Sequence, residues 1–184
     1  MRKTERPSAE TLEAVKAATA AAREGGRPVR VLFVCLGNIC RSPAAQGVME
    51  KMAADRGQAG RVECDSAGFY GGHRGQLPDM RMREAALQRG YRLDHRSRTV
   101  TWSDFIDYDL IVGVDRNNLD DLHRAAPSPE MERKIVPVID FALGHPGDTY
   151  VPDPYYEGAA GFQLVLDLLE DACGHLLDVL TDDD

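Results

Sequence analysis

The chain has 184 residues, of which 43% are hydrophobic and 28% charged, enough for one globular domain with a sizeable core. Its net charge of −8 argues against nucleic acid as a partner, because binding to a phosphate backbone requires a basic face. Any anionic ligand must then be held by a local positive site. The cysteines show neither a dense disulfide framework nor paired metal-ligand spacing, so we expect reduced thiols at Cys35, Cys40, Cys64 and Cys173.

No segment of the sequence has the character of a membrane anchor. The longest apolar stretches fall far short of the roughly 18 residues that span a bilayer. The first six residues also lack the apolar core of a signal peptide. We therefore expect no membrane span and a cytoplasmic location, with the acidic end at 182–184 forming a solvated tail.

Residues 1–28 are predicted to form an N-terminal extension that is mostly helical. The run from Pro7 to Arg23 is rich in helix-forming residues, has Ser8 as a candidate N-cap and ends at a pair of glycines. Because its apolar face is mostly alanine, it can bury little area, and we expect a loosely docked segment. The alternatives are a role in dimerisation or in covering the active site.

Beyond this extension, strand and helix patterns alternate through one domain at 29–184. The strands are predicted at 29–34, 62–65, 110–114 and 135–138, and the helices at 43–56, 80–89, 117–124 and 161–180. This order predicts a three-layer α/β domain, in which helices cover both faces of a four-stranded parallel sheet through right-handed crossovers. Ligands of such sheets bind beyond the carboxyl ends of the strands.

An anion-sized loop follows the first predicted strand. Five residues separate Cys35 from Arg41, directly after the apolar run Val31–Val34 and before Pro43, which can open a helix. At a helix N-terminus, the backbone N–H groups of residues 36–42 would converge on a tetrahedral oxyanion. Arg41 can hold two oxygens of that anion as a planar fork, and the helix end favours the thiolate form of Cys35. The loop therefore predicts displacement at phosphorus by sulfur.

The string from Val34 to Pro43 resembles the phosphate loop of the low-molecular-weight protein tyrosine phosphatases. Further motifs follow in the order of that family: Asp65-Ser66-Ala67-Gly68, Asp115-Arg116 with Asn118-Leu119, and Asp153-Pro154-Tyr155-Tyr156. The resemblance implies a flavodoxin-like strand order of 2-1-3-4. It also implies hydrolysis of phosphotyrosine in proteins through a cysteinyl-phosphate intermediate. The substrates would be phosphotyrosine-containing proteins, with inorganic phosphate as product or inhibitor.

This resemblance assigns the chemical steps to three residues. Cys35 would be the nucleophile and Arg41 the phosphate ligand. Asp153 would give a proton to the leaving group and then activate the water that hydrolyses the intermediate. Tyr155 and Tyr156 would form an aromatic wall against which a substrate ring packs.

The remaining loop residues are expected to bind phosphate or to hold the loop in shape. The phosphate-binding set comprises Leu36, Gly37, Asn38, Ile39, Cys40 and Ser42. Within it, Ser42 is placed to donate a hydrogen bond to the sulfur, and Asn38 would hold the loop in a strained shape. Cys40 lies on the same tight loop as Cys35 and could trap an oxidised Cys35 as a disulfide.

Three residues outside the loop are implied as supporting residues by the same resemblance. His95 would orient Ser42, Arg98 would tie together the neighbours of the loop, and Asp115 would help to position Arg41. Each has a plain alternative as a surface or capping residue. The family pattern around His95 and Arg98 is matched only with Ser97 in place of alanine.

No metal or cofactor is required by this interpretation. The five histidines show no paired spacing with a third ligand, and the chain lacks a Gly-x4-Gly-Lys-Ser/Thr nucleotide loop. The competing interpretations are arsenate reduction, phosphoarginine hydrolysis and a non-catalytic phosphate-binding module. Arsenate reduction would need two further thiols close together in a mobile segment, whereas Cys64 and Cys173 fall in a predicted strand and a predicted helix. Ile39, where phosphoarginine enzymes carry threonine, favours an aromatic ring, and Asp153 argues against binding without turnover.

One departure from the family concerns the wall of the pocket. Gly72 stands near the position where the family often places an aromatic residue. Glycines at 71 and 72 permit unusual backbone angles, so Tyr70 could replace the missing wall. Such a pocket is expected to prefer phosphotyrosine over phosphoserine.

Overall fold

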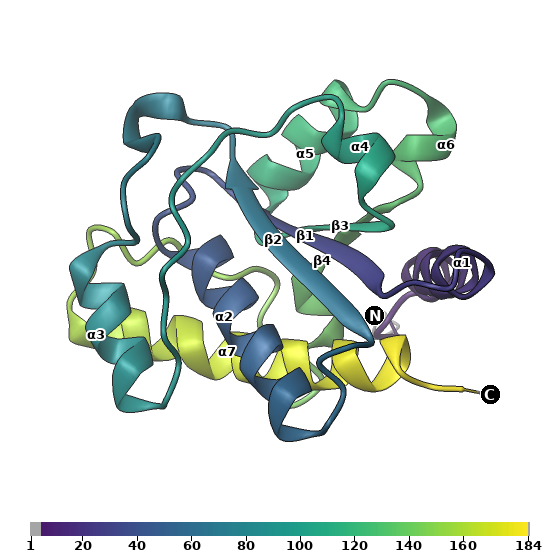
Figure 1. The fold of residues 1–184 in the computed structure, drawn as a ribbon. Helices are drawn as coiled ribbons and strands as arrows, with labels where there is room; N and C mark the ends of the chain where they lie inside the picture. Colours follow the sequence, from purple (N-terminus) through teal and green to yellow (C-terminus); the bar gives the residue numbers. More distant parts are fainter. Residues whose placement is uncertain (1–4, 184) are drawn as a thin grey trace.

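The computed structural model describes residues 5–183 and contains a four-stranded parallel sheet with the strand order β2-β1-β3-β4 (Figure 1). The strands are β1 (Val29–Cys35), β2 (Val62–Gly68), β3 (Leu110–Gly113) and β4 (Ile135–Pro137). The predicted α/β class and strand order are thereby confirmed. β2 runs three residues beyond its predicted end, because 66–68 continue the register with β1 as far as Gly68 opposite Cys35.

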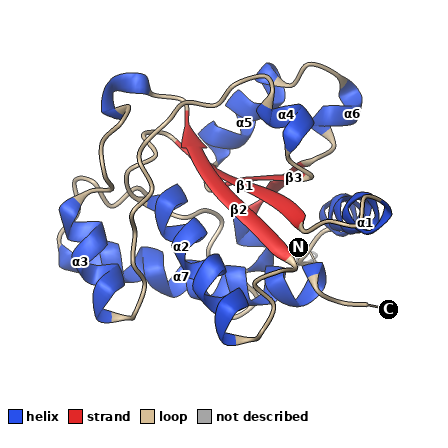
Figure 2. Cartoon of the chain, in the orientation of Figure 1, coloured by secondary structure: helices blue, strands red, loops and turns tan. Residues whose placement is uncertain are grey.

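Helices cover both faces of the sheet (Figure 2). On one face lie α1 (Ala9–Glu24), α2 (Arg41–Asp55), α3 (Met80–Gln88) and α7 (Ala159–Leu180). The other face carries α4 (Asp104–Asp107), α5 (Arg116–Ala125) and α6 (Pro129–Glu132). The short helices α4 and α6, together with the 3-10 turns η1 (Gly71–His73) and η2 (Val138–Phe141), were not predicted. A single turn of helix buries too few residues to leave a 3.6-residue pattern.

Strand β1 is the centre of the core. Val31 and Phe33 belong to the hydrophobic cluster beneath α2 and α7, whereas Leu32 and Val34 belong to the cluster beneath α4 and α5. Side chains alternate between the faces of a strand, so an uninterrupted apolar run is what a strand buried on both faces requires. The strand thus delivers its last residue, Cys35, to the carboxyl edge of the sheet.

Helix α1 is docked firmly, and the expectation of a loosely packed extension is wrong. Val15 is completely buried, and the alanines at 14, 18 and 22 are nearly so. Small side chains allow the helix to approach the sheet closely, so a face of alanine still excludes water. The predicted N-cap is confirmed, since Ser8 Oγ accepts from the backbone N–H of Thr11 at 3.2 Å.

Two polar contacts fix the ends of this segment. Thr11 Oγ1 donates to Asp140 Oδ2 at 2.6 Å, beyond the end of β4. Arg27 binds Asp109 with both terminal nitrogens, at 2.6 and 2.9 Å, before the start of β3.

Residues 1–4 of the predicted extension and Asp184 of the predicted tail lie outside the described residues. Within residues 5–183, no helix is long and apolar enough to cross a bilayer.

Candidate active site

The loop between β1 and α2 is held in a tight turn. Asn38 has a φ of 55°, the one positive value among non-glycine residues that the structure describes. This left-handed conformation is uncommon outside glycine and is maintained only where surrounding contacts fix it. α2 has no side-chain cap, since Cys40 occupies the N-cap position without a side-chain hydrogen bond. Its first backbone N–H groups therefore face the loop, as anion sites at helix N-termini require.

The sulfur of Cys35 lies at the bottom of this loop. Its Sγ accepts a hydrogen bond from the backbone N–H of Asn38 at 3.3 Å and lies 2.9 Å from Ser42 Oγ. The backbone N–H of Asn38 and the Ser42 hydroxyl thus fix the position of the sulfur in the loop. Cys35 itself is almost completely buried, so only a group that enters the loop can reach the sulfur.

The side chain of Asn38 connects the loop to its surroundings. Its Nδ2 donates to Ser42 Oγ at 2.7 Å and to Ser66 Oγ at 3.0 Å. Its Oδ1 accepts from the backbone N–H of Arg98 at 3.0 Å and lies 2.9 Å from His95 Nε2. His95 was expected to orient Ser42, and the two residues are linked through Asn38 rather than by a direct hydrogen bond. Asn38 stands between them, and His95 acts on the loop through that amide.

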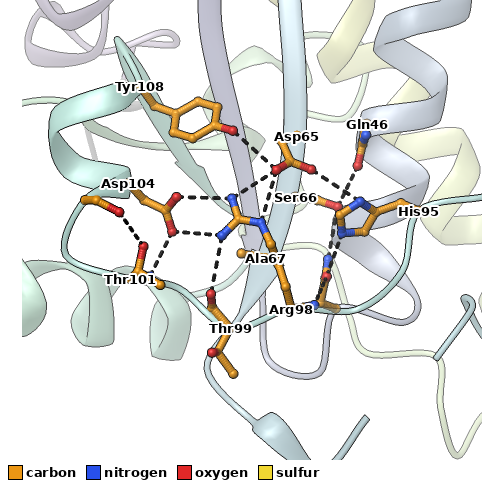
Figure 3. A network of polar contacts seen from close by, with 12 residues as sticks. Gln46, Asp65, Ser66, Ala67, His95, Arg98, Thr99, Thr101, Asp104 and Tyr108 are labelled. Carbon is orange, nitrogen blue, oxygen red and sulfur yellow. Dashed lines mark hydrogen bonds and ion pairs between the residues drawn. The ribbon is translucent and has the colours of Figure 1, made fainter. Parts of the chain in front are cut away.

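Arg98 ties two carboxylates together behind the loop (Figure 3). Its guanidinium lies 3.0 Å from Asp65 on β2 and 3.0 Å from Asp104 at the start of α4. Asp65 also lies 3.2 Å from His95 Nδ1 and accepts a hydrogen bond from the Tyr108 hydroxyl at 3.3 Å. Burial lowers the pKa of His95, with Asp65 opposing the shift and Arg98 adding to it. The amide oxygen of Asn38 can only accept, so His95 Nε2 is the donor in their contact.

Arg41 is the cation of the site. Its Nη1 donates to Asp115 Oδ2 at 2.6 Å and to the carbonyl oxygen of Val151 at 3.0 Å, and its Nη2 lies 3.7 Å from Asp153 Oδ2. Burial acts to lower the pKa of Arg41, but Cys35, Asp115 and Asp153 outweigh it and the pKa is raised. A buried, permanent cation on the loop favours a bound oxyanion.

Asp153 follows Arg41 by more than a hundred residues in the chain and lies on the loop after η2. The fold brings its carboxylate close to the Arg41 guanidinium. Asp153 Oδ1 accepts from the backbone N–H of Tyr155 at 3.0 Å, and about half of the side chain is exposed. Tyr155 and Tyr156 contact each other edge to face, with ring centroids 4.9 Å apart, and Tyr156 is 93% exposed. Arg81 of α3 lies under Tyr155 and donates to its carbonyl oxygen at 3.0 Å. The two aromatic rings thus stand at the mouth of the site, beside the carboxylate.

The walls of the mouth differ from the prediction in one respect. Ile39, expected to contact a substrate ring, is only 8% exposed and packs in the core, whereas Leu36 is 49% exposed. Leu36 therefore supplies the apolar surface on the loop. The ring of Tyr70 lies over Gly72, where any side chain would overlap it. Tyr70 thus fills the space beside Gly72, and its ring also contacts His73 edge to face.

Burial holds the pKa values of the other three thiols above their usual range. Burial raises the pKa of Cys40, and the nearby carboxylate of Asp79 adds to the shift. Burial likewise raises the pKa of Cys173 to about 12 and that of Cys64 well above its usual range. All four cysteines are free. Among residues 5–183, no group of three or more His, Cys, Asp or Glu side chains is arranged to hold a metal.

Sequence reasoning missed the residues that press the loop from outside. A Cβ on Gly68 would lie 2.5 Å from the carbonyl oxygen of Leu36 and 2.9 Å from the backbone nitrogen of Asn38. Ser97 Oγ donates to the carbonyl oxygen of Gly37 at 3.0 Å, so the departure from alanine adds a contact to the loop. The sequence did carry one indication of this contact. Gly68 ends the strand that pairs with β1, and a glycine in a strand often marks a close approach of another backbone segment.

Comparison with known proteins agrees with this geometry. The family profile of low molecular weight phosphotyrosine protein phosphatases matches residues 30–184. A low molecular weight protein-tyrosine-phosphatase from Streptomyces coelicolor is 42% identical over 150 residues, which cover 80% of this chain and 91% of that protein. The human low molecular weight phosphotyrosine protein phosphatase is 33% identical over 135 residues. The aligned residues cover 73% of this chain and 85% of that protein.

Solved structures give the same result. A crystal structure of protein tyrosine phosphatase from Entamoeba histolytica, with Hepes in the active site, superposes with a TM-score of 0.78 at 45% identity, covering 81% of this chain and 94% of the other. A Drosophila arginine phosphatase superposes with a TM-score of 0.77 at 30% identity, covering 84% and 99%. The chain belongs to the low molecular weight phosphotyrosine protein phosphatase family and, with it, to the protein-tyrosine-phosphatase enzymes.

Proposed function

We propose that this enzyme hydrolyses phosphotyrosine in proteins through a cysteinyl-phosphate intermediate, with Cys35, Arg41 and Asp153 as its catalytic residues. The observation that carries the proposal is the convergence on one loop of a hydrogen-bonded sulfur, a buried guanidinium and a carboxylate from a distant segment. The catalytic domain comprises residues 29–184, after an N-terminal extension at 1–28 whose helix α1 contacts the sheet.

In the first step, the Cys35 thiolate attacks phosphorus, a P–S bond forms and the P–O bond to the phenol breaks. Asp153 transfers its proton to the leaving phenol oxygen, so that no phenolate is released. Arg41 and the loop N–H groups hold the other oxygens of the phosphoryl group while charge redistributes among them. Ser42 supports the sulfur as nucleophile and, in the second step, as leaving group.

In the second step, water attacks the phosphorus and the P–S bond breaks. Asp153, now a carboxylate, takes a proton from that water, and inorganic phosphate and the Cys35 thiolate are regenerated. The positions of Asn38, His95 and Arg98 support this cycle indirectly, because they maintain the loop around the sulfur. Asp115 contributes by holding Arg41 in place.

A tyrosine substrate fits the rings that surround the mouth. Tyr70, Tyr155 and Tyr156 are all partly or fully exposed there and offer flat faces to a phenyl phosphate. Ring burial is worth a few kcal/mol, so the preference in kcat/KM over phosphoserine peptides is expected to exceed roughly tenfold. Phosphoarginine is the second candidate, since a related structure is named an arginine phosphatase and the burial of Ile39 removes one argument against it.

The test of the proposal is turnover of phosphotyrosine peptides, matched with phosphoserine and phosphoarginine peptides, by wild type and by Cys35→Ser. The variant is expected to lose turnover while still binding phosphate, because the loop amides and Arg41 remain. Arg41→Ala is expected to lose both. Substantial turnover by Cys35→Ser would exclude the covalent intermediate, and a clear preference for phosphoarginine would exclude the tyrosine assignment while leaving the cysteine mechanism intact.

The role of Asp153 is tested separately with a series of aryl phosphates. Asp153→Asn is expected to slow substrates with poor leaving groups by about 10²–10⁴-fold and activated ones far less, because only the former need the proton. Equal slowing across the series would contradict proton donation. Asp153 would then act only through its contact with Arg41.

A further inference from the structure

The segment from residue 73 to residue 98 has a charge opposite to that of the whole chain. It carries seven arginines against three carboxylates, in a protein with a net charge of −8. Most of these arginines have carboxylate partners within 4.0 Å, namely Arg81, Arg83, Arg89 and Arg98. The other arginines of this segment form no ion pair among the described residues, so their positive charge is not neutralised by a neighbouring carboxylate.

Arg74 and Arg96 are the two such arginines beside the phosphate loop. Arg74 Nη2 donates to Thr99 Oγ1 at 2.9 Å, and Arg96 Nη1 donates to the carbonyl oxygen of Gly75 at 2.9 Å. Both partners are neutral, both arginines are exposed, and neither has an ion pair among the described residues. A guanidinium has five N–H donors, so each retains donors for an external anion.

Backbone contacts place these two residues at the rim of the site. The segments that carry them are joined where Gly75 N donates to Ser97 O and Ser97 N donates to Gln76 O, both at 2.8 Å. Ser97 in turn donates through Oγ to the carbonyl oxygen of Gly37 in the phosphate loop. Arg96 directly precedes Ser97, so its backbone lies within about 4 Å of a residue that touches the loop.

Negative charge also lies close to the site. Asp153 is about half exposed, and Glu157, four residues later, is exposed. Within the arginine-rich segment, Asp79 and Asp94 are paired with Arg81 and Arg83. A peptide carboxylate that reaches Arg74 and Arg96 therefore meets positive charge that these two carboxylates do not neutralise.

We infer that Arg74 and Arg96 form an anion-binding rim that selects phosphotyrosine peptides with a carboxylate side chain within a few residues of the phosphotyrosine, on one side of it. The inference rests on the proposed phosphotyrosine activity and adds the class of peptide. Exposed ion pairs are individually weak, so the two arginines together are expected to give a preference of about three- to tenfold in kcat/KM. A second phosphoryl group on the substrate would satisfy the same donors.

The test compares phosphotyrosine peptides that differ only in glutamate or glutamine at the neighbouring positions, with the two sides of the phosphotyrosine varied separately. Wild type is expected to prefer glutamate on one side, through a lower KM that rises with added salt. The double variant Arg74→Gln/Arg96→Gln is expected to reduce this preference below about 1.5-fold. Arg133→Gln, an exposed arginine before β4 at the opposite end of the sheet, removes one equal charge and is expected to keep the preference.

Turnover of p-nitrophenyl phosphate, which has no flanking residues, normalises each variant. No preference in wild type, or a preference that survives in the double variant, would overturn the inference. A double variant that loses p-nitrophenyl phosphate turnover as strongly as peptide turnover would do the same, since the arginines would then only support the loop. Failure to hydrolyse any phosphotyrosine peptide would instead defeat the proposed function. A peptide with a neighbouring phosphoserine in place of glutamate shows which anion the rim prefers.

Discussion

Gly68→Ala tests whether the phosphate loop depends on the close approach of β2. A methyl group at this position would lie 2.5 Å from the carbonyl oxygen of Leu36 and 2.9 Å from the backbone nitrogen of Asn38. Both neighbours are backbone atoms, which cannot rotate away as a side chain could. Restoring ordinary contact distances requires the loop or the strand to move by roughly 0.5–1 Å.

A displacement of this size is expected to affect catalysis more than folding. Overpacking of a well-filled site costs about 1–3 kcal/mol of the free energy of unfolding. A misplacement of about 1 Å between reacting groups can cost on the order of 10²-fold in rate. We therefore expect Gly68→Ala to remain folded while kcat/KM on p-nitrophenyl phosphate falls by about two orders of magnitude.

Urea unfolding and steady-state kinetics on the same preparation separate the two effects. Gly60→Ala is the matched control, because a methyl group there meets open space at the opposite end of β2. It is expected to change neither quantity by a measurable amount. Wild-type kinetics for Gly68→Ala would refute the reasoning, and so would a loss of rate fully explained by the unfolded fraction.

Three further predictions address the groups around the loop. Asp115→Asn removes a charged acceptor from Arg41 and is expected to weaken phosphate binding by about ten- to a hundredfold, measured by calorimetry. The lowered pKa of His95 predicts that its contribution to stability is present above pH about 6.5 and lost as the pH falls through its folded pKa. Urea unfolding between pH 5 and 8 should therefore show a smaller slope for His95→Gln than for wild type. Peroxide followed by a thiol reductant should restore activity in wild type but not in Cys40→Ser, and equal recovery would show that Cys40 does not protect Cys35.

The sequence was sufficient where one residue pattern determined one structural outcome. The buried apolar run predicted β1 to within one residue. The ends of α2 and α3 also lie near their predicted positions, because each helix is followed by a glycine with positive φ, 69° at Gly57 and 89° at Gly90. The Cys-x5-Arg spacing located the loop because strand, turn and helix are contiguous in the chain. The association of Arg41 with Asp115 was expected from the family resemblance, and the contact is present.

What the sequence could not supply depends on distances between separate segments. The sequence suggested that His95 orients Ser42, but it could not show that Asn38 lies between these two residues and links them. Ile39 was expected to favour an aromatic ring of the substrate, but its side chain is 8% exposed and packs in the core. The close packing of α1 likewise depended on the shape of the sheet surface rather than on the size of its apolar side chains.

The ion pair between Arg41 and Asp153 has a consequence for the later part of the reaction cycle. Asp153 Oδ2 lies 3.7 Å from Arg41 Nη2, on one edge of the guanidinium. Under the proposed mechanism, a phosphoryl group bound at that edge would displace Asp153 and leave it free to face the leaving group. After hydrolysis, the return of Asp153 to Arg41 would compete with inorganic phosphate and favour its departure. The proposed general acid would thus also assist product release.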